Sequence, residues 1–495
     1  MRRVWRTLRP RHLGMGAFWA CSMLTFRSTV MFHGAVDTPS LSALIVVTSF
    51  VANMTTLLLA ASLIEHNPAV ADRVRLPVFC ALIVAGLGLL AVAGHLGETA
   101  PMLALVIAGA LLAGVGYGVF WGSWAETFGR VHPSRTSFYI PMNFLLTATL
   151  FLGVSLLVEL ADVPALPLIA WMPVASAACL ARCRRLDTGG QPTALAQVDG
   201  ATRPGGGIKG EAPRRTASPE GYTGAFRSLA PLLLTSIVLS FLFGFVWEIT
   251  VVAVGSVNEA HLLPLVANLA VALGIVAFVV LARWRIDLDA AYRLLVPVMV
   301  VAFIVMPLLW SRSPVVLNAL ISAGYGLFDV VIWFLVTSCA FDLGVSGFVT
   351  GGVVRAVSIL TRLVGIGVGY VITLVPDESM TMALVCVGVG AVTGGAPPIV
   401  LAGEVAVPSG DVPVPASVDE RCRRVAACYG LTRREAEVLP YLARGRSARV
   451  VAEALFVSEA TVRTHIRRIL EKTTLHSKQE IIDLIEAHEE CEAPQ

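Results

Sequence analysis

The chain has 495 residues and a formal net charge of only +3, while 56% of its residues are hydrophobic and just 14% are charged. This composition, with a mean hydropathy of +0.76, excludes an ordinary soluble globular protein. A multi-pass membrane protein is therefore predicted.

Apolar residues gather in about twelve runs, each long enough to cross the hydrocarbon core of a bilayer as a helix. These runs predict an all-α membrane bundle, in which the sixth and tenth runs fit a simple span least well. They lie near 13–36, 41–64, 76–96, 101–124, 138–160, 164–181, 229–254, 261–282, 292–310, 314–340, 347–375 and 380–403.

Lysine and arginine fall on alternate sides of these runs. They crowd the N-terminus, the loops at Arg73 and Arg130 and the central polar segment, whereas the opposite loops hold only Arg312. Because basic loops stay in the cytoplasm, both termini are predicted to be cytoplasmic, with the bundle in the inner membrane.

A polar segment rich in Gly, Pro and Ser, 182–227, follows the sixth run and is predicted to be a disordered cytoplasmic linker. It divides the membrane region into two six-helix halves, 1–181 and 228–403. The hexapeptide Gly116–Trp121 of the fourth run recurs in the tenth as Gly324–Asp329, a pattern typical of paired repeats.

This layout resembles the major facilitator superfamily of transporters. The loop signature of that family is only half present, since Asp72-Arg73 is there but Pro68 and Arg75 stand in place of its glycines. That signature belongs to the gating machinery of working transporters, so its loss favours a role other than transport.

Charged residues are costly inside a membrane, so those in mid-span are candidate ligand-binding residues. The predicted ligand set combines four such charges with tryptophans of the same spans: Arg27, Trp121, Trp124, Trp247, Glu248, Asp329, Trp333 and Arg362. The resemblance implies a central cavity lined by the first, fourth, seventh and tenth spans. Structural pairing of Arg27 with Glu248 or Asp329 is the alternative, and Arg355 is expected to reach the interface near a span end.

The C-terminal part begins with a Pro-rich, acidic tether, 404–420, and continues as a predicted domain, 421–495. Thr432 with Glu435 forms a capping box that starts one helix, and Ser458 caps another that runs to Lys472. In the latter helix the apolar residues fall on one face and the basic residues on the other.

This region resembles the DNA-binding domain of LuxR-type transcriptional regulators. The shared motifs are Leu431-Thr432-x-Arg434-Glu435-x-Glu437-Val438-Leu439, then Leu442-Ala443-x-Gly445-x-Ser447, and Ser458-x-x-Thr461-Val462-Arg463-x-His465. The resemblance implies a four-helix helix-turn-helix domain in which Arg463, Thr464 and Arg467 face base edges. It implies phosphate contacts for Arg449, Thr461 and Arg468.

Charge supports double-stranded DNA as the partner independently of the motifs. Between Arg421 and Lys478 there are thirteen basic and five acidic residues, a balance of +8 against +3 for the whole chain. The apolar stripe of Ile481, Ile482, Leu484 and Ile485 suits either the core or a dimer contact, and RNA polymerase is a further candidate partner.

The sequence therefore predicts a membrane-bound transcriptional regulator whose bundle senses a small molecule. A secondary transporter with an appended DNA-binding domain is the alternative, and a DNA tether with an inert membrane part is a weaker one. No catalytic residue set, metal-ligand spacing or cofactor motif is found, so neither an enzyme nor a cofactor is predicted.

Overall fold

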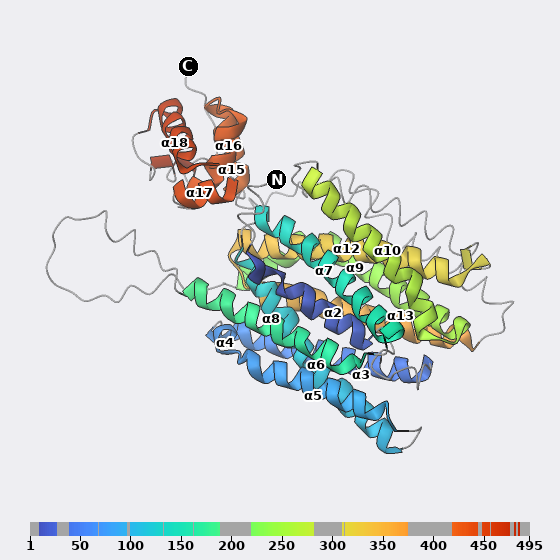
Figure 1. The fold of residues 1–495 in the computed structure, drawn as a ribbon. Coiled ribbons are helices and arrows are strands. Elements are labelled where there is room, and N and C mark those ends of the chain that lie inside the picture. Colours follow the sequence, from blue (N-terminus) through green and yellow to red (C-terminus); the bar gives the residue numbers. More distant parts are fainter. Residues whose placement is uncertain are drawn as a thin grey trace, which may run out of the picture. The chain divides into compact units, whose positions relative to one another are not determined.

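The protein, as a computed structural model, contains two compact units (Figure 1), Arg9–Glu404 and Val405–Gln495 with Met1–Leu8. Within both units every described element is a helix. The described residues are 9–26, 39–67, 69–96, 100–131, 133–161, 163–188, 219–281, 309–310, 312–374, 418–443, 448–455, 457–475, 480–481 and 484–485.

The first unit is a bundle of long apolar helices. Its described elements are η1 (Pro10–Leu13), α2 (Gly14–Phe26), α3 (Pro39–His66), α4 (Ala69–Arg73), α5 (Leu76–Ala93), α6 (Ala100–Gly129), α7 (Pro133–Ala161), α8 (Ala165–Thr188), α9 (Pro219–Val254), α10 (Val257–Leu281), α12 (Pro314–Leu343) and α13 (Gly347–Thr373). Nine helices within the described residues are long and apolar enough to cross a membrane.

These nine include the sixth and tenth predicted runs, which form the uninterrupted helices α8 and α12. The first run is described only as α2, up to Phe26. The predicted spans 292–310 and 380–403 lie almost wholly or wholly outside the described residues.

The predicted linker is shorter than 182–227 at both ends. Helix α8 continues to Thr188 and α9 already begins at Pro219, so the stretch 189–218 is what remains, and it lies outside the described residues. Polar composition misplaced these boundaries because a helix can extend past its apolar span once its backbone hydrogen bonds are made within the helix itself.

Glycine lets the helices approach closely. A Cβ on Gly109 of α6 would lie 2.8 Å from the carbonyl oxygen of Gly86 in α5, and one on Gly369 of α13 would lie 2.9 Å from that of Phe245 in α9. Hydrocarbon offers no hydrophobic drive between helices, so such close packing supplies much of their association.

Polar contacts join segments that are distant in sequence. Asn143 of α7 accepts a hydrogen bond from the backbone N–H of Gly16 at 2.6 Å and donates to the carbonyl of His12 at 2.9 Å. Glu126 of α6 accepts from the Ser346 hydroxyl at 2.7 Å and the Phe348 N–H at 2.9 Å. Glu126 therefore binds the N-terminus of α13 and joins the two halves of the bundle.

The second unit contains α15 (Val418–Cys428), α16 (Arg433–Ala443), α17 (Ala448–Leu455) and α18 (Glu459–Thr473). It has its own hydrophobic core, to which all four helices contribute. Fully buried members include Val425, Leu439, Val451, Val462 and Ile469. Helix thus begins at Val418, three residues before the predicted start of the domain.

Candidate DNA-binding surface and transmembrane pocket

Helix α18 begins as the sequence predicts. The Ser458 hydroxyl accepts a hydrogen bond from the Thr461 N–H at 3.1 Å, which satisfies one of the donors left free at a helix start. Val462 and Ile469 are buried in the domain core. One face of α18 is therefore fixed, and the opposite face is open to a partner.

The open face carries the arginines. The side chains of Arg463 and Arg467 are 72% and 73% exposed, and Arg468 is exposed as well. Arg463 pairs with Glu459 at 2.7 Å and Arg467 with Glu471 at 3.6 Å, both within the helix. Such exposed pairs are weak, so DNA can replace the carboxylates at little cost.

The remaining predicted DNA contacts are spread around this face. Thr461 is exposed, whereas Thr464 is half-buried and donates to the Ala460 carbonyl at 3.0 Å. Arg449 lies in α17, but its side chain falls outside the described residues. Arg463 and Arg467, four residues apart, lie one above the other on α18.

A buried carboxylate holds α18 against α16. Glu435 completes the predicted capping box by accepting from the Thr432 N–H at 2.7 Å, and it also accepts from Lys472 Nζ at 2.8 Å. The same Nζ donates to the Gly430 carbonyl at 3.0 Å. This contact fixes the angle of α18, which sets where its arginines point.

The end of α18 is packed into the domain. Thr473 is buried and its hydroxyl donates to the Ile469 carbonyl at 2.8 Å, while Thr474 adopts a left-handed conformation with φ 55°. Ile481 and Ile485 are buried in the domain core. The core therefore uses these two residues, and a dimer contact would need others.

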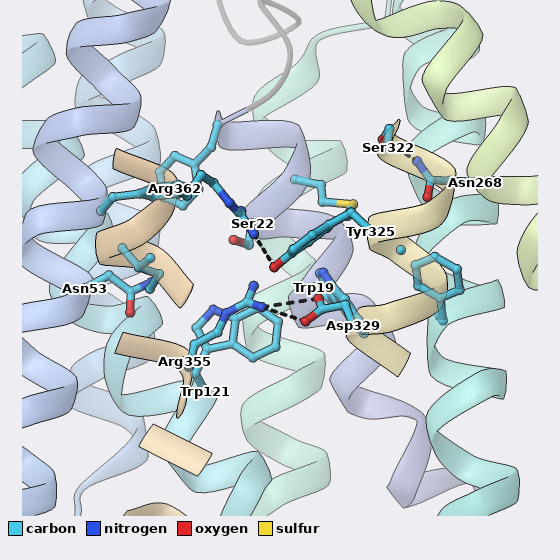
Figure 2. Close-up of a pocket in the computed structure, with 16 residues that line it drawn as sticks. Trp19, Ser22, Asn53, Trp121, Asn268, Ser322, Tyr325, Asp329, Arg355 and Arg362 are labelled. Carbon is cyan, nitrogen blue, oxygen red and sulfur yellow. Dashed lines mark hydrogen bonds and ion pairs between the residues drawn. The ribbon is translucent and has the colours of Figure 1, made fainter. Parts of the chain in front are cut away.

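The membrane unit contains a partly open cavity among helices of both halves (Figure 2), and the space around it, about 590 Å³, includes open solvent. Helices α2, α3, α6, α7, α10, α12 and α13 contribute to its wall. The lining residues are Trp19, Ser22, Met23, Phe26, Phe50, Asn53, Trp121, Phe144, Asn268, Ser322, Tyr325, Gly326, Asp329, Arg355, Ile359 and Arg362. The wall thus combines aromatic and aliphatic side chains with about as much polar surface, and polar groups of this kind can fix the orientation of a small molecule.

Three charged side chains meet in this cavity. Arg355 donates from Nη1 to both carboxylate oxygens of Asp329, at 3.1 and 3.2 Å, and its guanidinium lies 4.2 Å from the ring centroid of Trp121. Arg362 donates to the Tyr325 hydroxyl (Figure 2). Both arginines come from α13, which the sequence did not predict to line the cavity.

The predicted ligand set divides in the structure. Trp121, Asp329 and Arg362 line the cavity, and Trp333 stacks on Trp121 at 5.2 Å in a smaller adjoining hollow that Asp329 and Arg355 share. Arg27 lies outside the described residues.

Three predicted ligand residues are placed elsewhere. Trp124 donates to the Ser176 hydroxyl at 2.9 Å, and Trp247 donates to His261 Nε2 at 2.9 Å. Glu248 is buried on α9 but does not line the cavity. The seventh span, α9, contributes none of the lining residues, so the expectation for that span was wrong.

Arg355 is the residue that sequence reasoning missed. It was expected at the interface because it lies near the start of a hydrophobic run, yet α13 begins at Gly347 and carries Arg355 two turns inward. A sequence signal did exist, since Asp329 needed a buried cationic partner. Within the described residues, no group of three or more His, Cys, Asp or Glu side chains gathers as metal ligands would.

Residues 430–485 match the family model described as "Bacterial regulatory proteins, luxR family". The same region is 52% identical over 44 residues to the uncharacterized transcriptional regulatory protein YhcZ of Bacillus subtilis. It is 42% identical over 52 residues to the transcriptional regulatory protein DegU of Brevibacillus brevis. These alignments cover 9% and 10% of this chain, and only 21% and 22% of the two relatives.

The membrane unit is similar to solved transporters. A bacterial homologue of the iron transporter ferroportin, outward-facing with soaked iron, aligns with a TM-score of 0.55 and 16% identity, covering 80% of this chain and 100% of that chain. A second structure of an outward-facing bacterial ferroportin homologue, whose description does not mention iron, aligns with a TM-score of 0.54, covering 81% of this chain and 99% of that chain. A proton:xylose symporter of the major facilitator superfamily aligns with a TM-score of 0.48 and 12% identity, covering 78% of this chain and 93% of that chain.

The likeness to the ferroportin homologue confirms an all-α bundle with the fold of a membrane transporter, and the family-model match confirms a luxR-type domain at residues 430–485. At 16% identity the structural likeness establishes the fold alone. The protein is thus a multi-pass membrane protein with a DNA-binding type of domain at its C-terminal end.

Proposed function

We propose that this protein is a membrane-bound, sequence-specific transcriptional regulator whose transmembrane bundle senses a small molecule. The observation that carries the proposal is the open face of α18, where Arg463 and Arg467 stand exposed on a helix whose other face is buried in a domain of the luxR family type. That is the arrangement by which a recognition helix enters a major groove.

In this proposal Arg463, Thr464 and Arg467 read base edges, and Arg449, Thr461 and Arg468 bind phosphates. Because Arg463 and Arg467 are each held only by an exposed carboxylate one turn away, they exchange that carboxylate for DNA without leaving a buried charge unpaired. Two tethered domains on paired half-sites would bind by avidity, so self-association of the chain would control DNA occupancy.

The DNA-binding domain must share a compartment with the chromosome, so both termini are placed in the cytoplasm and the bundle in the inner membrane. The alternation of Lys and Arg in the loops supports this orientation. A ligand in the cavity regulates output only if it binds one state of the bundle better than another. The contact of α13 with Asp329, Tyr325 and Glu126 offers an element whose position the ligand can bias.

The test is a transcript profile of cells that express the wild type or the Arg463→Ala/Arg467→Ala variant. Each base-contacting arginine is worth about 1–3 kcal/mol, so losing both should abolish specific regulation. Arg433→Ala/Arg434→Ala is the control, because these side chains are 94% and 70% exposed on α16 and the same two charges are lost from the same domain. Identical profiles for the double variant and the wild type would refute the proposal.

The likeness of the membrane unit to transporters favours a second candidate, a secondary transporter that carries a DNA-binding regulatory domain. Uptake into proteoliposomes, with the Asp329→Asn variant as control, separates the two functions. Saturable accumulation of a ligand that also changes transcription would replace the pure sensor by a transporter with a regulatory domain.

A further inference from the structure

The charges in the transmembrane cavity do not balance. Both carboxylate oxygens of Asp329 are occupied by Arg355, so this pair neutralises itself. Arg362 is the third charged side chain of the lining, and it has no carboxylate partner among the described residues. Among the described residues, the lining therefore carries one positive charge without a carboxylate partner.

Arg362 is only partly satisfied by its surroundings. It is 4% exposed, and its one hydrogen bond to the described residues goes to the Tyr325 hydroxyl. Its Nε is buried without an acceptor there. The guanidinium carbon lies 4.7 Å from the ring centroid of Tyr325 and 4.9 Å from that of Phe243, and these faces return only part of the hydration lost on burial.

The predicted membrane spans outside the described residues do not supply the missing anion. The stretches 27–36, 292–310 and 380–403 contain neither Asp nor Glu, and the first of them adds a cation, Arg27. A buried arginine is normally paired, and neither the described residues nor these stretches offer Arg362 a carboxylate partner, so an anion that enters the cavity would supply one.

We propose that the cavity binds a small organic anion, with its carboxylate or other oxyanion head on Arg362. Phe50 lies against the guanidinium, and Trp19, Met23 and Phe144 add apolar surface to a wall that also carries polar side chains, so the body of the anion has an apolar part. This inference rests on the proposed sensing role and names the chemical class that the sensor recognises. A planar guanidinium suits an oxyanion because it donates two parallel hydrogen bonds.

Benzoate and phenylacetate are suitable probes, with benzamide as the neutral match for benzoate and inorganic phosphate as an anion without an apolar body. All nine tryptophans lie between Trp5 and Trp333. Eight of them lie in the unit Arg9–Glu404, so the tryptophan fluorescence of the full-length protein in detergent follows mainly the thermal unfolding of the bundle. A ligand that binds only the folded state stabilises it by RT ln(1 + L/Kd), where L is the ligand concentration, so the unfolding midpoint rises as L exceeds Kd.

We expect both organic acids to raise the midpoint of the wild type, and benzamide and phosphate to leave it unchanged. Arg362→Gln should weaken the apparent affinity for benzoate about 10- to 100-fold, as expected for a lost hydrogen bond to a charged group. Arg312→Gln, at an exposed position outside the cavity, removes the same charge and should leave the affinity unchanged. Asp329→Asn should tighten binding several-fold, because a repelling carboxylate is removed.

Tyr325→Phe is a second variant that tests the proposal if Arg362→Gln does not fold. It keeps the cation and removes its hydrogen-bond partner, so benzoate should bind at least as tightly as in the wild type. Equal shifts from benzamide, equal shifts in Arg362→Gln, or no shift from either organic acid in the wild type would overturn the proposal. A rise in the unfolding midpoint with phosphate and with neither organic acid would refute the claim that the ligand has an organic, apolar part. The assay involves no DNA, so an intact regulon with no anion binding would leave the regulator standing and remove only this inference.

Discussion

The buried carboxylate of Glu435 should decide the stability of the DNA-binding domain. This side chain is 1% exposed and accepts hydrogen bonds from the Thr432 N–H at 2.7 Å and from Lys472 Nζ at 2.8 Å. Lys472 is near the end of α18 and Glu435 is in the first turn of α16. One carboxylate thus starts one helix and positions the other.

The magnitude follows from the pKa of Glu435. Burial by itself would raise this pKa, but the hydrogen bonds from Lys472 and from Thr432 outweigh burial and lower it from 4.5 to about 2. A difference of this size corresponds to about 3 kcal/mol of folding free energy. Because the folded pKa is the lower one, the contribution is complete above pH 4.5 and is lost as the pH falls through about 2.

The assay is urea unfolding of the fragment 418–495, which carries its own hydrophobic core, after circular dichroism has shown that the fragment is helical. Glu435→Gln keeps the shape and removes the charge, so we expect a loss of about 2–3 kcal/mol at pH 7. Glu437→Gln is the matched control, because Glu437 pairs only with the exposed Arg433 and Arg434 and should cost at most about 1 kcal/mol.

The pH dependence provides the second half of the test. The stability of the wild-type fragment should fall more steeply than that of Glu435→Gln as the pH is lowered from 4.5 to about 2. Equal losses from Glu435→Gln and Glu437→Gln at pH 7, or parallel pH profiles for the wild type and Glu435→Gln, would refute the reasoning.

Three further substitutions have definite expected outcomes. Thr474→Gly should raise the free energy of unfolding of the fragment by about 1 kcal/mol, because a β-branched residue is strained at φ 55°. An unchanged urea midpoint would contradict this. Ser458→Ala should lower stability by about 1 kcal/mol through loss of the cap on α18, again measured in urea. Gly365→Ala should lower the thermal midpoint of the full-length bundle, since its Cβ would overlap the Phe241 carbonyl, whereas Gly367→Ala on the same helix meets nothing within 4 Å and should be neutral.

Local features of the DNA-binding domain could be predicted from the sequence because the residues that form them are neighbours. The box of Thr432 with Glu435 and the cap of Ser458 each join groups three residues apart, so the sequence alone contains both partners. The bond between Lys472 and Glu435 joins residues 37 positions apart and depends on how α18 packs on α16. No pattern of spacing contains that information.

The membrane bundle shows the same limit on a larger scale. Length and hydropathy predicted the spans because both are properties of a continuous segment. Which face of a span meets the cavity is not such a property, because a helix that is apolar all round has no hydrophobic face to reveal it. Trp124, Trp247 and Glu248 were therefore assigned to a pocket that their helices turn them away from.

The cost of burying charge was the sequence rule that carried furthest. It selected Asp329 and Arg362, which do line the cavity, but it offered Asp329 only Arg27 as an alternative partner and placed Arg355 at the interface. The rule states that a charge inside the membrane needs a partner, and only packing states which one. Once Arg355 is assigned to Asp329, the same rule leaves Arg362 requiring an anion, and this requirement ties the architecture of the bundle to the chemistry of its ligand.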